Sequence, residues 1–171
     1  MRYVVEETGL NSFRLIKKVL DELYCRLPSK EKDILIQNRL ENLRYEYKGL
    51  DVGAVPSYND LFTNFAYVYC YVAAHANIVY ELLNLKNSQE LADAFDGNIL
   101  KLSCQGGGPG SDIVGILKYV ESKNKLATLN FCVYDREVRW RDSLSSVCNH
   151  LTSFGSVKSF VVRPLTCERV I

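Results

Sequence analysis

The sequence has almost no net charge and no long apolar run. Its 171 residues include 21 Lys and Arg against 20 Asp and Glu. General binding to a nucleic-acid backbone needs many uncompensated basic residues, so this composition does not indicate a nucleic-acid partner. No apolar stretch reaches the roughly 18–20 residues of a membrane-spanning helix, because polar residues interrupt the nearest candidate, residues 62–83. The sequence therefore predicts no membrane segment.

The cysteines lack the spacing of a zinc site or of a disulfide framework. All six are single, and no Cys-x-x-Cys pair occurs: Cys25, Cys70, Cys104, Cys132, Cys148 and Cys167. The first residues, MRYVVEE, carry acids where a secretory signal would be apolar. We expect reduced thiols, no bound metal and an intracellular protein of the cytoplasm or nucleus.

The pattern of apolar residues changes near Gly97. Before it, apolar residues recur every three or four positions, which predicts helices over 10–24 and 34–47 and one or two helices over 58–85, a segment rich in aromatic residues. A short helix over 89–95 is expected to lead into the first strand. After Gly97, short apolar runs alternate with helical patterns in the order β-α-β-α-β. We divide the chain into an N-terminal helical region, 1–56, and a partial α/β domain with lead-in helices, 57–171.

The second half predicts a parallel sheet, because strands that alternate with helices form crossover units. The expected strands are 99–104, 128–134 and 157–162, and the expected helices are 110–122 and 140–151. The strands are short and largely apolar, which is typical of a parallel sheet covered by helices on both faces.

A glycine-rich turn joins the first strand to its helix. Four of the five residues from Gly106 to Gly110 are glycine, whereas a purely structural turn at such a position commonly has one. Gly106, Gly108 and Gly110 form Gly-x-Gly-x-Gly, and Ser111 stands where a dinucleotide fingerprint would have its last glycine. Glycines here let the backbone approach a ligand, so the turn predicts a binding loop.

An acid closes the second strand. Asp135 follows the apolar run 129–134 and lies 29 residues after Gly106 (135 − 106). An acid at this place accepts hydrogen bonds from ribose hydroxyls in doubly wound folds, although their usual spacing is about 20 residues. Glu137 is the alternative if the strand ends later.

The glycine loop and the strand-end acid resemble motif I and the ribose-binding acid of class I S-adenosylmethionine-dependent methyltransferases. The resemblance covers about residues 57–163 and implies a partial doubly wound, Rossmann-like α/β sheet of about three strands that binds S-adenosylmethionine. It implies that the helix before the core lies over the cofactor, with Asn59 and Tyr67 as further candidate contacts. The cofactor-binding residues that it implies are Gly106, Gly107, Gly108, Gly110, Asp112, Asp135, Arg136 and Tyr58.

The chain departs from the family at Cys104, where many members carry an acid that holds the ammonium group of the cofactor. Ser103 and Asp112 are the alternatives for that role, the latter favoured by its place at a helix N-terminus. The 74 residues after Gly97 (171 − 97) suffice for only three strands and two helices, without the segment that positions the methyl acceptor. No residue is nominated as a catalytic base.

Three interpretations of the truncated sheet remain open. The chain is a fragment of a longer methyltransferase, a homodimer across the open edge of the first strand, or a non-catalytic interaction module that binds a protein or RNA. A different nucleotide ligand at the same place is a further alternative.

Overall fold

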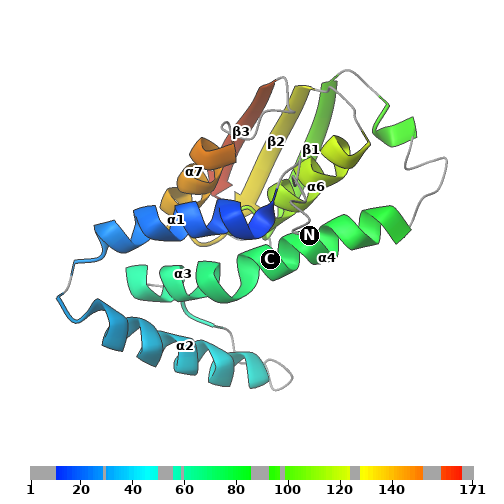
Figure 1. The fold of residues 1–171 in the computed structure, drawn as a ribbon. Coiled ribbons are helices and arrows are strands. Elements are labelled where there is room, and N and C mark those ends of the chain that lie inside the picture. The colour runs from blue at the N-terminus through cyan, green and yellow to red at the C-terminus, as the bar shows by residue number, and fades with distance from the viewer. Residues whose placement is uncertain are drawn as a thin grey trace, which may run out of the picture.

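The computed structural model describes residues 11–28, 30–49, 56–58, 60–85, 93–96, 99–123 and 128–151, and the backbone of 159–166. The described part is a mixed α/β structure that is mostly helical (Figure 1). The predicted order, helices first and then strands alternating with helices, is confirmed. No helix within these ranges is long and apolar enough to cross a membrane.

Helices make up the N-terminal half. They are α1 (Ser12–Arg26), α2 (Lys32–Lys48), α3 (Leu61–Tyr67), a π-helical segment (Val68–Val72) and α4 (Ala73–Leu85). Two of them begin at a polar cap. The Asn11 side chain accepts from the backbone N–H of Arg14 at 3.0 Å, and Asp60 accepts from Phe62 and Thr63, each at 3.0 Å. The predicted short helix over 89–95 lies largely outside the described residues.

Three parallel strands and two helices follow. They are β1 (Ile99–Gln105), α6 (Ser111–Ser122), β2 (Thr128–Asp135), α7 (Trp140–Leu151) and β3 (Ser159–Thr166), with strand order β1-β2-β3. The register places Gln105 beside Tyr134 and Asp135 beside Thr166, so the strands end together at one edge of the sheet. β3 continues through Pro164, beyond the predicted end at 162, and a proline is tolerated there because β3 has a partner strand on only one side in the described sheet.

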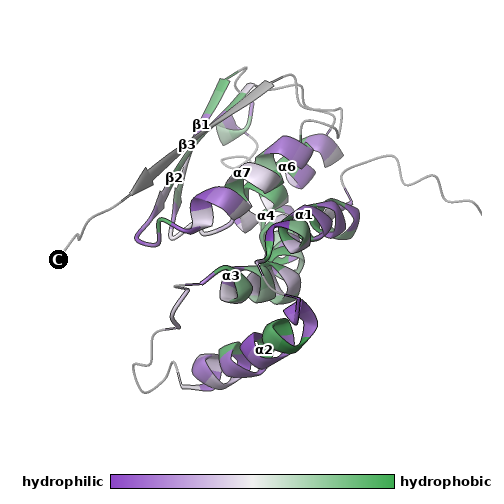
Figure 2. Cartoon of the chain, turned by 90° about the vertical axis from the view of Figure 1, so that its left-hand side faces the viewer, coloured by the Kyte–Doolittle hydropathy of each residue, from purple (hydrophilic) through white to green (hydrophobic). Residues whose placement is uncertain are grey.

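All described helices lie on one side of the sheet, as Figure 2 shows with the strands seen nearly edge-on. Along β1, Leu100 and Cys104 are buried, whereas Lys101 and Ser103 are exposed and Ile99 is 61% exposed. The prediction of helices on both faces is therefore wrong for the described residues. The reason is the two-residue alternation of a strand, which turns every second β1 residue to the uncovered face.

A glycine lets the lead-in helix cross the first crossover helix closely. A Cβ on Gly115 of α6 would lie 2.6 Å from the carbonyl oxygen of Ala76 and 2.7 Å from the Cβ of Val79, both in α4. The two helices therefore meet at the backbone of Gly115. This contact fixes α4, and with it the residues at the start of the same helical run, relative to the sheet.

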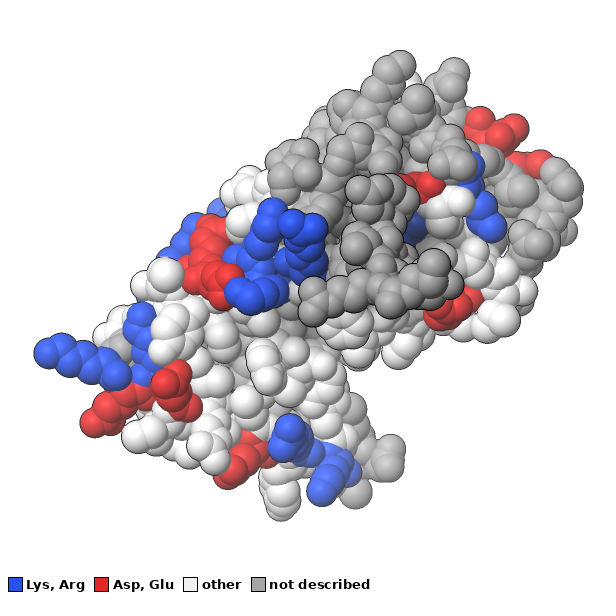
Figure 3. Space-filling view, viewed as in Figure 1, with Lys and Arg blue, Asp and Glu red and all other residues white. Residues whose placement is uncertain are grey.

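Acidic and basic side chains are interspersed on the face shown in Figure 3. Lys17 pairs with Asp21 at 2.7 Å along α1, and Arg26 pairs with Glu22 one turn later. Most of these groups are largely exposed, so each pair contributes little to stability.

One polar contact ties α1 to α7. The Glu22 carboxylate accepts from the Ser146 hydroxyl at 2.6 Å, and the same oxygen lies 3.0 Å from Nε2 of His150. Ser146 is only 1% exposed. Its hydrogen bond, together with the charge of Arg26, lowers the pKa of Glu22 below its ordinary 4.5, and partial burial opposes this.

Ser146→Ala should lower the free energy of unfolding by about 1–2 kcal/mol at pH 7, because it removes a hydrogen bond to a carboxylate. A pKa that is lowered in the folded state stabilises the fold above pH 4.5, and this stabilisation is lost as the pH falls through the folded pKa. Urea unfolding at pH 7 and pH 3 should thus give a smaller difference between wild type and variant at pH 3. An equal difference at pH 7 and pH 3 would show that the contribution of Ser146 does not depend on the charge of Glu22.

Candidate functional site

The glycine loop is bonded to the end of β2. The backbone N–H groups of Gly106 and Gly107 donate to the carbonyl oxygen of Tyr134 at 2.8 and 3.3 Å. Gly106, Gly108 and Gly110 have φ angles of +65°, +48° and +94°, which side-chain-bearing residues rarely adopt. The loop therefore needs glycine at three places for its backbone path alone.

The four glycines differ in what surrounds them. A Cβ on Gly107 would meet Cγ1 of Val133 at 2.8 Å, and one on Gly110 would meet Cδ1 of Leu144 at 2.8 Å. A Cβ on Gly106 would meet nothing within 4 Å, and one on Gly108 would come no closer than 3.8 Å to Trp140. Gly107 and Gly110 thus serve packing, and Gly108 is buried near Trp140, whereas the space beside Gly106 is open.

Asp135 is held against the loop. One of its carboxylate oxygens accepts from the backbone N–H of Gly108 at 2.8 Å, and the other accepts from Glu137 at 2.9 Å. β2 ends at Asp135, so the strand-end acid is this residue rather than Glu137. Two backbone donors therefore orient the carboxylate.

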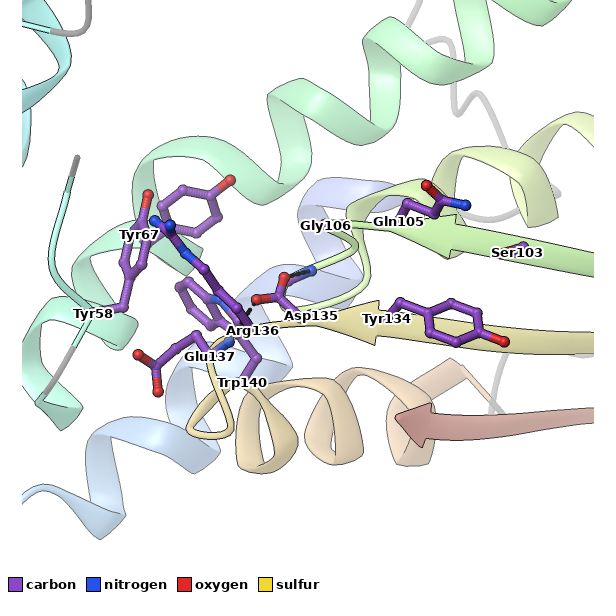
Figure 4. A pocket seen from close by; sticks show the side chains of 11 residues that line it. Tyr58, Tyr67, Ser103, Gln105, Gly106, Tyr134, Asp135, Arg136, Glu137 and Trp140 are labelled. Carbon is purple, nitrogen blue, oxygen red and sulfur yellow. Dashed lines mark hydrogen bonds between the residues drawn. The ribbon is translucent and has the colours of Figure 1, made fainter. Parts of the chain in front are cut away.

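A cavity of about 800 Å³ opens at the carboxyl ends of β1 and β2 (Figure 4). This volume is typical of small-molecule and cofactor sites. Its wall combines the glycine loop, the strand ends, the start of α7 and two tyrosines from the helical half. The lining residues are Tyr58, Tyr67, Ser103, Gln105, Gly106, Gly108, Tyr134, Asp135, Arg136, Glu137 and Trp140.

Three aromatic rings form one wall of the cavity. The ring centroid of Trp140 lies 4.8 Å from that of Tyr58 and 5.0 Å from that of Tyr67, and the two tyrosines are 5.5 Å apart. The hydroxyl of Tyr58 is 2.8 Å from that of Tyr47, at the end of α2. Burial is the main cause that raises the pKa of Tyr58 and Tyr67 above the ordinary value, so both remain neutral phenols.

The position two residues before the first glycine of the loop is apolar and uncharged. Cys104 is 4% exposed, and burial, with smaller effects from Asp112 and Cys132, raises the pKa of its thiol to about 11. Burial also raises the pKa of Asp112, opposed by the nearby His75. Of the two alternatives, Ser103 lines the cavity and Asp112 does not.

The structure brings five of the eight predicted cofactor residues to the cavity: Tyr58, Gly106, Gly108, Asp135 and Arg136. The other three, Gly107, Gly110 and Asp112, lie next to it without lining it. Asn59 lies outside the described residues. Tyr67, a further candidate, lines the cavity.

Among the strand residues of the lining, sequence reasoning missed Gln105 and Tyr134. They are paired across β1 and β2 and belong to the uncovered face of the sheet. The signal that could have found them is the two-residue period that also places Ser103 on this face.

No group of three or more His, Cys, Asp or Glu side chains in the described ranges could hold a metal ion. In comparisons with known proteins, no protein-family model matches the chain, and no curated protein matches it. The functional inference therefore rests on the geometry of this cavity.

Proposed function

We propose that the chain binds S-adenosylmethionine in the cavity at the glycine loop, as the cofactor-binding half of a class I methyltransferase-like protein. The observation that carries this proposal is the Asp135 carboxylate, bonded to the Gly108 N–H where the parallel strands end. Ligands of open α/β sheets bind outside the carboxyl ends of the strands. In this proposal β1, β2 and β3 are part of a Rossmann-like, doubly wound sheet.

Asp135 holds the ribose in this proposal. Each of its oxygens accepts one backbone hydrogen bond and retains a further lone pair for a ribose hydroxyl. The open space at Gly106 admits the methionine portion, and the Ser103 hydroxyl replaces the family acid as a contact for its polar end. Tyr58, with Tyr67 and Trp140, borders the junction of the ribose and the methionine portion, and Arg136 borders the remainder of the ligand.

The bound cofactor supplies an electrophilic methyl group. The described residues fix the ribose and surround the cofactor, so their contribution is to position it. Holding the reacting groups in the right geometry lowers the barrier of the reaction. A complete reaction also needs a methyl acceptor and residues that orient it, and we assign that role to none of the described residues.

Thermal unfolding with a panel of ligands tests the proposal. S-adenosylmethionine or S-adenosylhomocysteine should raise the melting temperature, since a ligand at 100 times its Kd stabilises a fold by about 2.7 kcal/mol. NAD should have no effect. Stabilisation by NAD alone would favour a different nucleotide ligand, and no effect of any ligand at millimolar concentration would favour the interaction module.

The interaction module is the second candidate because of β1. Within the described residues β1 pairs with β2 alone, and Ile99 is 61% exposed on the uncovered face. Open edges of apolar strands pair readily with other chains. If the chain forms a homodimer through this strand, Ile99→Lys should convert it to a monomer in light scattering after size exclusion. A dimer that persists in the variant would place the contact elsewhere.

A further inference from the structure

The cavity combines aromatic rings with carboxylates, which is the chemistry of a cation site. Tyr58, Tyr67 and Trp140 line the cavity together with Asp135 and Glu137. The three rings lie within 4.8–5.5 Å of one another, centroid to centroid. Aromatic faces attract compact cations, most strongly where water is excluded.

Two carboxylates act on Tyr67, that of Asp135 in the cavity lining and that of Asp112 outside it. Burial and the contact with Tyr47 are the larger causes that raise the pKa of the Tyr67 hydroxyl, and the charges of Asp112 and Asp135 raise it further. A group beside Tyr67 therefore lies in the field of two acids that come from different elements, α6 and β2. A positive group gains from that field, and a neutral group does not.

A cationic side chain already extends toward these rings. Figure 4 shows Arg136 reaching from the end of β2 toward Tyr58 and Tyr67. Its charge is the only positive one among the lining residues, against the two carboxylates of Asp135 and Glu137. The lining of the cavity thus remains net negative.

S-adenosylmethionine carries a positive sulfonium, whereas its demethylated product, S-adenosylhomocysteine, has a neutral thioether at the same position. We propose that Tyr58, Tyr67 and Trp140 form an aromatic cage for this sulfonium, so that the cavity binds the cofactor more tightly than the product. The inference rests on the proposed function, because it assumes that the cofactor occupies this cavity. Tighter binding of the cofactor than of its product would favour replacement of bound S-adenosylhomocysteine by S-adenosylmethionine.

Isothermal titration of the full chain with both ligands tests the cage. S-adenosylmethionine should bind about tenfold more tightly than S-adenosylhomocysteine. The amine analogue, in which a carbon that carries an ammonium group replaces the methylated sulfur, should also bind more tightly than the product. Tyr67→Leu should weaken binding of the two cations several-fold and leave the affinity for S-adenosylhomocysteine unchanged.

Two variants serve as controls. Tyr67→Phe keeps the ring and should retain the preference for the cation, although it loses the hydroxyl contact with Tyr47. Tyr45→Leu removes an aromatic ring that is 81% exposed on α2 and should change neither affinity. If Tyr67→Leu unfolds, Tyr58→Leu gives the same comparison.

The outcomes separate the cage from the proposed function. Equal or tighter binding of S-adenosylhomocysteine by the wild type would overturn the cage and leave cofactor binding intact. If Tyr67→Leu weakens binding of S-adenosylmethionine and S-adenosylhomocysteine equally, the ring has only a packing role, which would also overturn the cage. Absence of binding by all three ligands would overturn both proposals.

Discussion

Asp135→Asn should weaken binding of S-adenosylmethionine by at least about 100-fold. Asp135 is expected to accept hydrogen bonds from two ribose hydroxyls, and a hydrogen bond to a charged group contributes about 1.5–3 kcal/mol. The amide keeps one accepting oxygen but cannot accept at its nitrogen, so a ribose contact is lost together with the charge. It also leaves the N–H of Gly108 or Glu137 unpaired, and we expect the free energy of unfolding to fall by about 1–2 kcal/mol.

Glu137→Gln is the matched control, since Glu137 lines the same cavity two residues later. It should change the affinity by less than about threefold, because a partly solvated charge that makes no direct contact with the ribose contributes little. Titration calorimetry on both variants gives the comparison, and circular dichroism checks that each is folded. A large loss in Glu137→Gln with near-normal binding by Asp135→Asn would make Glu137 the ribose acid.

Gly106→Asn should abolish binding while the fold remains stable. Asparagine tolerates the positive φ of this position better than most residues, and a Cβ there meets no atom within 4 Å. The added side chain would enter the cavity where the proposed ligand approaches the loop. We expect no heat of binding at millimolar ligand and a melting temperature within a few degrees of the wild type.

Gly107→Ala provides the contrast. Its Cβ would lie 2.8 Å from Val133 and 3.0 Å from Cys104, so the variant should lose stability by about 1–3 kcal/mol through overpacking. Any loss of affinity in this variant should accompany the loss of stability. If Gly106→Asn binds the cofactor normally, the ligand does not approach this part of the loop.

Helices and strands of the described part were predictable because their apolar residues follow the periods of 3.6 and 2. The helix over 140–151 and the strand beginning at 128 match the observed bounds. The uncovered face of the sheet was not anticipated, because Ile99 and Cys132 make the strand sequences look apolar on both sides. Attention to Lys101 and Ser103 would have indicated the exposed face.

The candidate site was predictable where local sequence determines it. A glycine loop after a strand and an acid at the end of the next strand lie at the same edge of a parallel sheet, so Gly106, Gly108 and Asp135 come together. The packing roles of Gly107 and Gly110 depend on Val133 and Leu144 in other elements, and no local pattern reveals them.

The aromatic wall depends on tertiary contacts as well. The sequence marks the residues from 58 to 80 as rich in tyrosine, but a stripe of this kind usually belongs to the core. Tyr67 lines the cavity where the helical run passes into the π-helical segment Val68–Val72, a feature that is frequent at functional sites. Its neighbour Trp140 comes from the start of α7, which no spacing within either segment predicts.

The most direct test of the proposed cofactor binding is a two-dimensional ¹⁵N–¹H spectrum of the chain during titration with S-adenosylmethionine. We expect saturable shifts of the backbone N–H groups of Gly106, Gly108 and Glu137 and of the indole N–H of Trp140, since these groups border the cavity. Signals of Ser146 and its neighbours at the α1–α7 contact should not move. Unchanged spectra at millimolar ligand, or shifts confined to residues remote from the loop, would contradict binding at this site.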